Sequence, residues 1–197
     1  MASDGLETSM GRPMRLFHTG KVAIPAPDIR HGRVNADFGQ GFYLTPDADF
    51  TYRWARRDAV VNEYELDLTG LRVRRFERGE AWFDYIYQNR RARDTVDADV
   101  VIGPIANDTI FDTYGIISSG YLKPADALAL LRIGPEYTQV AVKTEQAAAG
   151  LRWLGARTVA DAEAHREDLE EERARYDRLF AEQVECIMGG GEGAGPL

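Results

Sequence analysis

Residues 38–45 read FGQGFYLT, and this stretch says most about the fold. Two glycines flank one glutamine, and an apolar, aromatic run follows at once. Glycine lets the backbone approach another group closely, whereas aromatic side chains favour strands. We therefore expect the chain to pass close to a ligand here and then to enter a strand at residues 41–45.

The composition bounds the class of protein. The 197 residues are 44% hydrophobic and 28% charged, which fits one globular domain with tails. The net charge of -8 argues against general attraction to nucleic acid or anionic lipid. Cys186 is the only cysteine and the three histidines lack zinc spacing, so we expect no disulfide and no metal. An apolar run of about 18 residues and a signal core are both absent, which predicts a cytoplasmic protein.

The chain divides by composition into four parts. Residues 1–13 are small and polar and predict a disordered leader, and residues 14–156 predict the folded domain. Residues 157–188 predict an acidic helical extension, because residues 157–185 hold five arginines and ten acidic residues around an incomplete apolar stripe. That stripe could dock on the domain or pair with another chain. Residues 189–197 predict a flexible tail.

Hydrophobic periodicity and turn residues predict the elements of the domain. The segment between the first two strands is expected to be a loop with one helical turn. Asp47 is expected to cap the N-terminus of a helix over residues 48–61. The remaining predictions are strands at 14–20, at 98–106 and at 139–143, two strands joined by a bend within 62–76, helices at 80–93 and 123–132, and a short element at 144–154.

Taken in order, six short motifs resemble a known family. They are LFHTG, NADFGQGFYLT, a helix ending in RWA, YELDLTGLRV, VIGPIAND and QVAVKTEQA. Together they resemble the ADP-ribosyltransferase superfamily of the diphtheria-toxin and poly(ADP-ribose)-polymerase type, and more closely an uncharacterised bacterial family placed in it. The resemblance covers residues 14–154. It implies an α+β fold with a split mixed β-sheet, flanking helices and, here, a C-terminal acidic helix, with NAD as substrate and no metal.

The resemblance also implies roles for single residues. The His18 imidazole would bind a ribose hydroxyl, and Tyr43 would stack on the nicotinamide ring with Trp54 on its other face. Thr51 would bind the nicotinamide amide. Arg30 and Arg33 lie in the loop that would cover the pyrophosphate. The implied NAD-binding set is His18, Thr19, Gly20, Arg30, Arg33, Gly41, Phe42, Tyr43, Thr51 and Trp54.

Gln139 stands where most active relatives have a glutamate, and with His18 and Tyr43 it completes the implied catalytic set. A glutamine can hold a hydroxyl but cannot act as a base. Three outcomes are therefore open: transfer that needs no strong base, rescue by another carboxylate, or NAD binding without turnover. The auxiliary residues to examine are Asp37, Asn107, Asp108 and Glu136.

The expected activity is mono-ADP-ribosyl transfer from NAD to a macromolecular acceptor, protein or nucleic acid, by an intracellular bacterial toxin or defence effector. One alternative is a non-catalytic module that binds NAD or an ADP-ribosylated partner. Another is an interaction protein that works through its acidic C-terminal helix. A third is an NAD glycohydrolase that passes ADP-ribose to water.

Overall fold

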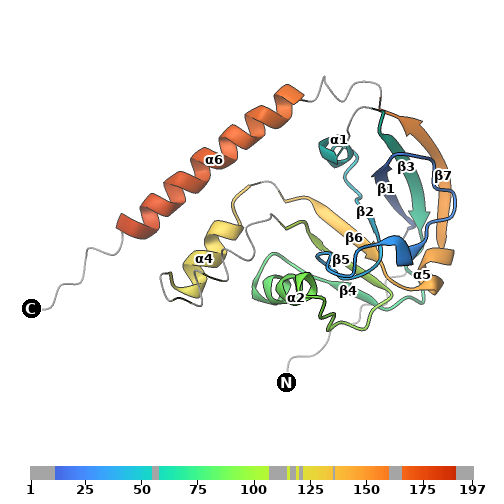
Figure 1. Cartoon of the computed structure of the whole chain (residues 1–197), viewed down its shortest axis with the longest axis horizontal. Coiled ribbons are helices and arrows are strands. Elements are labelled where there is room, and N and C mark those ends of the chain that lie inside the picture. The colour runs from blue at the N-terminus through green and yellow to red at the C-terminus, as the bar shows by residue number, and fades with distance from the viewer. Residues whose placement is uncertain are drawn as a thin grey trace, which may run out of the picture. The chain divides into compact units, whose positions relative to one another are not determined.

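The computed structural model describes residues 12–54, 58–106, 115, 119, 122–134, 136–159 and 166–189. Its fold is α+β, as expected. The described residues within Met1–Ala106 and Glu136–Ala162 form one compact unit, and those within Asn107–Pro135 and Glu163–Leu197 form another. The first unit contains two β-sheets, and the second contains the helices α4 (Pro124–Leu131) and α6 (Arg166–Gly189) (Figure 1).

The first sheet has three antiparallel strands in the order β1-β3-β7 (Figure 1). The strands are β1 (Met14–Gly20), β3 (Val60–Leu66) and β7 (Leu151–Thr158). Side chains alternate across the sheet, so that Tyr64 and Leu66 are fully buried while Glu65 between them is not. This alternation gives the sheet one face that packs in the core.

The second sheet has four strands in the order β2-β6-β5-β4. They are β2 (Phe42–Leu44), β6 (Thr138–Val142), β5 (Val100–Pro104) and β4 (Val73–Arg75). The sheet is mixed, because β4 and β5 run parallel while the other pairs are antiparallel. A parallel pair needs a long crossover, and α2 (Glu80–Arg90) lies within it. Every residue of β5 is buried, as its apolar run predicts.

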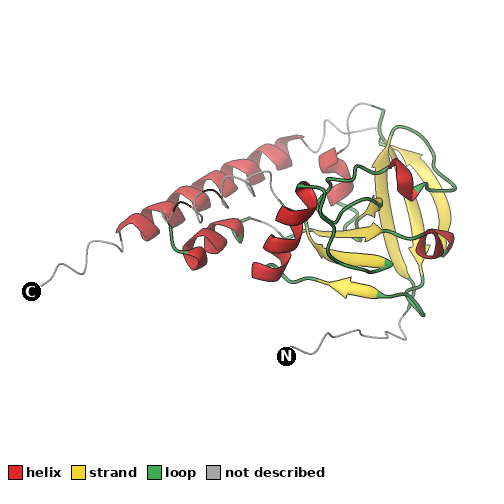
Figure 2. Cartoon of the chain, turned by 60° about the horizontal axis from the view of Figure 1, so that its bottom comes forward, coloured by secondary structure: helices red, strands yellow, loops and turns green. Residues whose placement is uncertain are grey.

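The two sheets share one core and meet at one point. The core cluster takes Leu16 and Tyr64 from the first sheet and Val100 and Val140 from the second. At the junction Phe17 bridges Thr45 with two backbone hydrogen bonds of 2.8 and 2.9 Å. Figure 2 shows the two groups of strands meeting side by side. The junction therefore brings β1 next to β2, and β2 next to β6.

The helix predicted at 48–61 is wrong at its C-terminal end, and residues 55–57 lie outside the described part. Helix α1 is Phe50–Trp54, and β3 already begins at Val60. Asp58 between them has a φ of 64°, which a helix does not allow. The Oδ2 atom of Asp47 accepts a hydrogen bond from the backbone N–H of Thr138 at 2.9 Å, and the Asp47 carbonyl accepts from the backbone N–H of Phe50 at 3.1 Å. Thr45 also binds β6, because its Oγ1 donates to the Thr138 carbonyl at 2.8 Å.

The other elements agree with the predictions to within a few residues. Helices α2 and α4 and strands β5 and β6 lie where the sequence places them, and η1 (Ile29–His31) is the expected turn of helix. The short element expected at 144–154 is instead a helix, α5 (Glu145–Ala149), followed by the start of β7. The expected extension at 157–188 begins too early, because β7 reaches Thr158. The leader residues 1–11 and the tail residues 190–197 lie outside the described part.

The acidic helix packs against its own chain. In the second unit α6 contacts α4 and the residues that follow it. A Cβ added to Gly134 would lie 2.9 Å from the ring of Tyr176, and that ring packs on Phe180 at 5.9 Å. Gly134 has a φ of 96°, so glycine suits both the turn and the close ring. The apolar stripe of this helix is expected either to dock on the domain or to pair with another chain. Its residue Tyr176 packs within its own chain.

Asp99 and Arg72 clamp the parallel pair β4 and β5. The Asp99 carboxylate accepts from the Arg72 backbone N–H at 2.8 Å, from Nε at 3.1 Å and from Nη2 at 3.0 Å. The hydrogen bonds from Arg72 hold the pKa of the Asp99 carboxyl below its ordinary value. Stability from this pair is therefore present above the unfolded pKa of about 3.9 and is lost as the pH falls through the lower native pKa.

Asp99→Asn should accordingly lower the free energy of unfolding at pH 7 by about 1 kcal/mol, a modest loss because the Arg72 side chain is partly exposed. Urea unfolding of both proteins between pH 7 and pH 2 measures the difference. The two proteins should converge at the acid end. A difference that persists at full size there would contradict the role given to the charge.

Candidate functional site

His18 lies on β1 at the junction of the sheets. Its Nδ1 is 2.7 Å from the carbonyl oxygen of Tyr43, and its ring stacks on Phe42 at 4.4 Å. Because a carbonyl oxygen only accepts, we assign the proton to Nδ1. Burial lowers the pKa of His18, so the ring is neutral at pH 7. Its Nε2 is then an acceptor, as binding of a hydroxyl group requires.

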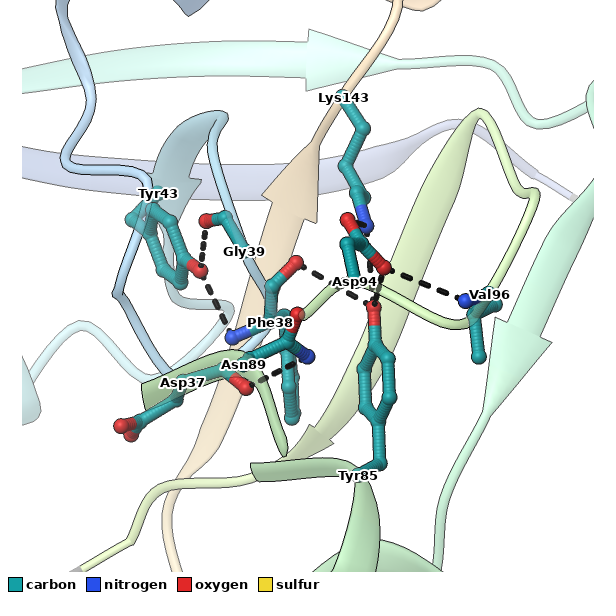
Figure 3. A network of polar contacts seen from close by, with 9 residues as sticks. All are labelled: Asp37, Phe38, Gly39, Tyr43, Tyr85, Asn89, Asp94, Val96 and Lys143. Carbon is teal, nitrogen blue, oxygen red and sulfur yellow. Dashed lines mark hydrogen bonds and ion pairs between the residues drawn. The ribbon is translucent and has the colours of Figure 1, made fainter. Parts of the chain in front are cut away.

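Tyr43 lies on β2, with its side chain on the opposite face from its buried neighbours Phe42 and Leu44. Its hydroxyl accepts from the backbone N–H of Phe38 at 2.8 Å and donates to the Gly39 carbonyl at 2.7 Å (Figure 3). Burial raises the pKa of the Tyr43 phenol, which therefore stays protonated. The hydroxyl is thus used to hold the loop that precedes β2.

The two glycines of FGQG approach atoms of the protein itself. Gly39 has a φ of 78°, and a Cβ there would lie 2.5 Å from the Oδ2 atom of Asp94. A Cβ on Gly41 would lie 2.7 Å from the carbonyl oxygen of Val142. The sequence correctly indicates a close approach of backbone. Internal packing accounts for it, so these glycines are not independent support for a ligand.

Gln139 lies on β6 and is 4% exposed. Its Nε2 donates to the Oδ2 atom of Asp37 at 3.2 Å and to the carbonyl of Pro104 at 3.2 Å. Both hydrogens of the amide are therefore engaged, and Oε1 can accept. Of the suggested carboxylates that the structure describes, Asp37 and Glu136, Asp37 is the one hydrogen-bonded to Gln139.

Two residues of α2 hold Asp37 from the other side. The Oδ1 atom of Asp37 accepts from Arg90 Nε at 2.9 Å, and its backbone carbonyl accepts from Asn89 Nδ2 at 3.2 Å. The side chains of Asp37 and Arg90 are 16% and 13% exposed. An ion pair so little exposed is screened weakly by salt. Asp37 is therefore fixed between β6 and α2, with a small part of its side chain exposed.

Residues 14–153 match a family model described as "Protein of unknown function (DUF3990)". The chain belongs to this family. The matched span contains both sheets apart from the end of β7, together with His18, Asp37, Tyr43 and Gln139. No curated protein and no solved structure matches the chain.

The sequence did not predict a partly buried ionic network in the DUF3990 domain. Lys143 Nζ pairs with Asp94 Oδ2 and lies 3.0 Å from the Tyr85 hydroxyl, although the Lys143 side chain is only 8% exposed. The Tyr85 hydroxyl also lies 3.3 Å from the Phe38 carbonyl and 3.1 Å from Asp94 Oδ1 (Figure 3). Burial raises the pKa of Tyr85, so its hydroxyl keeps its proton. The network anchors the 37–39 segment at Phe38.

Two of the residues predicted to contact nicotinamide are Thr51 and Trp54. The Thr51 hydroxyl is hydrogen-bonded within the protein, and the Trp54 side chain is not described. The Thr51 side chain is fully buried, and its Oγ1 donates to the Ala48 carbonyl at 2.5 Å. The Thr51 carbonyl in turn accepts from Thr19 Oγ1 at 3.1 Å. Thr51 therefore does not present its hydroxyl to a ligand in this structure. The Trp54 side chain, Asn107 and Asp108 lie outside the described residues.

The remaining predicted residues lie near the junction or on the surface. Gly20 follows His18 on β1, and a Cβ there would lie 3.4 Å from His18 Nε2. Arg30 pairs with Glu145 at 2.9 Å, and both side chains are well exposed. Arg33 and Glu136 are exposed as well. Within the described residues, no group of three or more acidic, histidine or cysteine side chains could hold a metal ion, and no helix is both long and apolar enough to cross a membrane.

Proposed function

We propose that this protein is an NAD-dependent mono-ADP-ribosyltransferase with an ADP-ribosyltransferase-like fold and a macromolecular acceptor. The proposal starts from the sequence motifs. The observation that supports it best is that His18, Tyr43 and Gln139, far apart in sequence, lie on the neighbouring strands β1, β2 and β6. They also lie close to the junction of the two sheets. An NAD site at this junction would use all three residues.

The chemistry of the reaction fits these side chains. Breaking the bond between nicotinamide and ribose develops positive charge on the sugar, so the site must orient the ribose and hold the leaving group. Neutral His18 offers Nε2 to a ribose hydroxyl, and stacking on the Tyr43 ring is the proposed contact for the cationic pyridinium. Gln139 supplies hydrogen bonding without basicity, so synthesis of a polymer is not expected.

Labelled NAD, incubated with the full chain and a bacterial lysate, tests the activity. Label should enter protein or nucleic acid, which are counted separately. His18→Ala and Gln139→Ala should each reduce the label at least roughly tenfold, because the first removes the proposed contact to the ribose and the second removes a buried hydrogen-bonding group of the site. Asp84→Asn is the control, since Asp84 is an exposed residue of α2 outside the site. Label that survives both alanine variants would contradict the assigned site.

One observation favours a second function, binding of NAD without turnover. Gln139 is almost fully buried and both of its amide hydrogens are engaged by Asp37 and Pro104. A binding module would give heat with NAD in calorimetry and would release no nicotinamide over hours. Free ADP-ribose without labelled macromolecule would instead indicate an NAD glycohydrolase.

A further inference from the structure

The carboxylate beside Gln139 has a role that the motifs do not assign. We propose that Asp37 is the catalytic carboxylate of this site, and that Gln139 and Arg90 are positioning residues for it. The inference rests on the proposed transferase function. In this inference Gln139 does not take the place of a catalytic glutamate; it holds Asp37 in position.

The surroundings of residue 139 require a hydrogen-bond donor. The Gln139 amide points at two acceptors, the Asp37 carboxylate and the Pro104 carbonyl. The Pro104 carbonyl is itself fixed, because it also accepts from Trp82 Nε1 at 2.9 Å. An ionised glutamate could donate to neither acceptor and would repel both. The amide thus fits this position, and the negative charge is on the neighbouring side chain.

Asp37 is positioned as a reacting group needs to be. One carboxylate oxygen is held by Arg90 and the other by Gln139. Each oxygen has a second lone pair, so the group can still accept from a ligand. Its side chain is 16% exposed, whereas Gln139 is 4% exposed as a whole residue. Of the two side chains, Asp37 is the better placed to meet a substrate from outside.

The backbone around Asp37 is fixed at both ends. Its carbonyl accepts from Asn89, and the next N–H, of Phe38, donates to the Tyr43 hydroxyl. Tyr43 in turn accepts the His18 hydrogen bond at its carbonyl. A continuous set of hydrogen bonds therefore runs from His18 through Tyr43 and the 37–38 backbone to Gln139. Rigid support of this kind keeps a catalytic group in productive geometry.

The reaction step balances without a further reactant. The hydroxyl or amine of the acceptor attacks C1′ of the ribose as the C1′–N bond to nicotinamide breaks. The electron pair of that bond leaves on the nicotinamide nitrogen, which becomes neutral. The proton of the acceptor moves to the Asp37 carboxylate, which acts as general base. The products are ADP-ribosylated acceptor, nicotinamide and one proton.

The test compares Asp37→Asn with wild type by nicotinamide release in the presence of the lysate acceptor. Asparagine keeps the size and accepts from Arg90, but it cannot take a proton. The value of kcat/KM should fall by about 100-fold or more. The Kd for NAD, measured by calorimetry, should change less than about threefold because the base acts on the acceptor. Asp84→Asn, which removes an exposed carboxylate from α2, is the matched control.

The pH profile separates a base from a structural residue. In wild type, kcat/KM should rise with pH to a plateau, and this acid limb should be absent in Asp37→Asn. Gln139→Ala and Arg90→Lys should each lower kcat at least about threefold, leave the KM for NAD nearly unchanged and keep more activity than Asp37→Asn. An unchanged kcat in both positioning variants would overturn the inference. Because these two variants retain Asp37, they keep the test decisive even if Asp37→Asn fails to fold.

The outcomes distinguish the inference from the function on which it rests. Wild-type protein that releases no nicotinamide and labels no macromolecule would overturn the proposed function, and the inference with it. Active wild type with Asp37→Asn within about threefold of it would leave the function standing and overturn the role of Asp37. Active wild type with the expected loss and the missing acid limb supports both.

Discussion

Gly32→Ala should lower the free energy of unfolding by about 3 kcal/mol, or roughly 10 °C in Tm. A Cβ on Gly32 would lie 2.2 Å from the carbonyl oxygen of Gly41, and Gly41 itself abuts the carbonyl of Val142 on β6. The backbone at Gly32 and the backbone at Gly41 therefore cannot shift easily to make room for the Cβ. The two segments must separate, which breaks the hydrogen bonds from Gln40 Nε2 to the Arg30 and Gly32 carbonyls at 2.9 and 3.1 Å.

Gly70→Ala is the matched control for this substitution. Gly70 has a φ of 76°, but a Cβ there would meet nothing within 4 Å. Gly70→Ala should therefore lower the free energy of unfolding by about 1 kcal/mol, and this loss should come only from backbone strain at the positive φ. Gly32 has a φ of -67°, so its cost is steric. Chemical denaturation of the three proteins measures both losses; a loss in Gly32→Ala no larger than that in Gly70→Ala would contradict the large steric cost expected at Gly32.

Gln139→Glu should lower the free energy of unfolding at pH 7 by about 3 kcal/mol. The new carboxylate would lose hydrogen bonds to Asp37 and Pro104 and would face one charged and one neutral acceptor. Its pKa in the folded protein should be raised by the neighbouring carboxylate. The penalty should therefore be smallest below the unfolded pKa of about 4.3 and should grow as the pH rises through the folded pKa.

The double variant Asp37→Asn with Gln139→Glu exchanges the amide and the carboxyl. Asparagine at residue 37 can donate to the new glutamate, so the exchange should recover more than about 1 kcal/mol relative to Gln139→Glu alone. Urea unfolding of the four proteins at pH 4 and pH 7 measures the cycle. A penalty that is equal at both pH values, or that the exchange leaves unchanged, would show that charge repulsion is not its cause.

The sequence predicts elements well where one local signal acts alone. The apolar run of β5 and the stripe of α2 lead to the right elements. The helix expected at 48–61 is wrong because its apolar spacing spans a short helix and the start of a strand. Val60 and Val61 extend β3, where they pair with β1 and β7. Strand pairing is a long-range contact, and local periodicity carries no information about it.

The candidate site could be predicted only in part for the same reason. The motifs select His18, Tyr43 and Gln139, and these lie on neighbouring strands. The hydrogen bond between Asp37 and Gln139 joins residues 102 positions apart, so no local sequence pattern predicts it. Likewise, the glycines of FGQG indicate close approach, but which group is approached depends on the tertiary fold.

The place of β2 at the edge of its sheet has a consequence for biosynthesis. Its sheet neighbour is β6, which is encoded far later, after β3, β4 and β5. Long-range pairings of this kind raise the contact order and delay the pairing until the later strand is available. A ribosome releases the chain from its N-terminus, so His18 and Asp37 emerge long before Gln139. The nascent chain therefore carries no assembled site until β6 has left the ribosome.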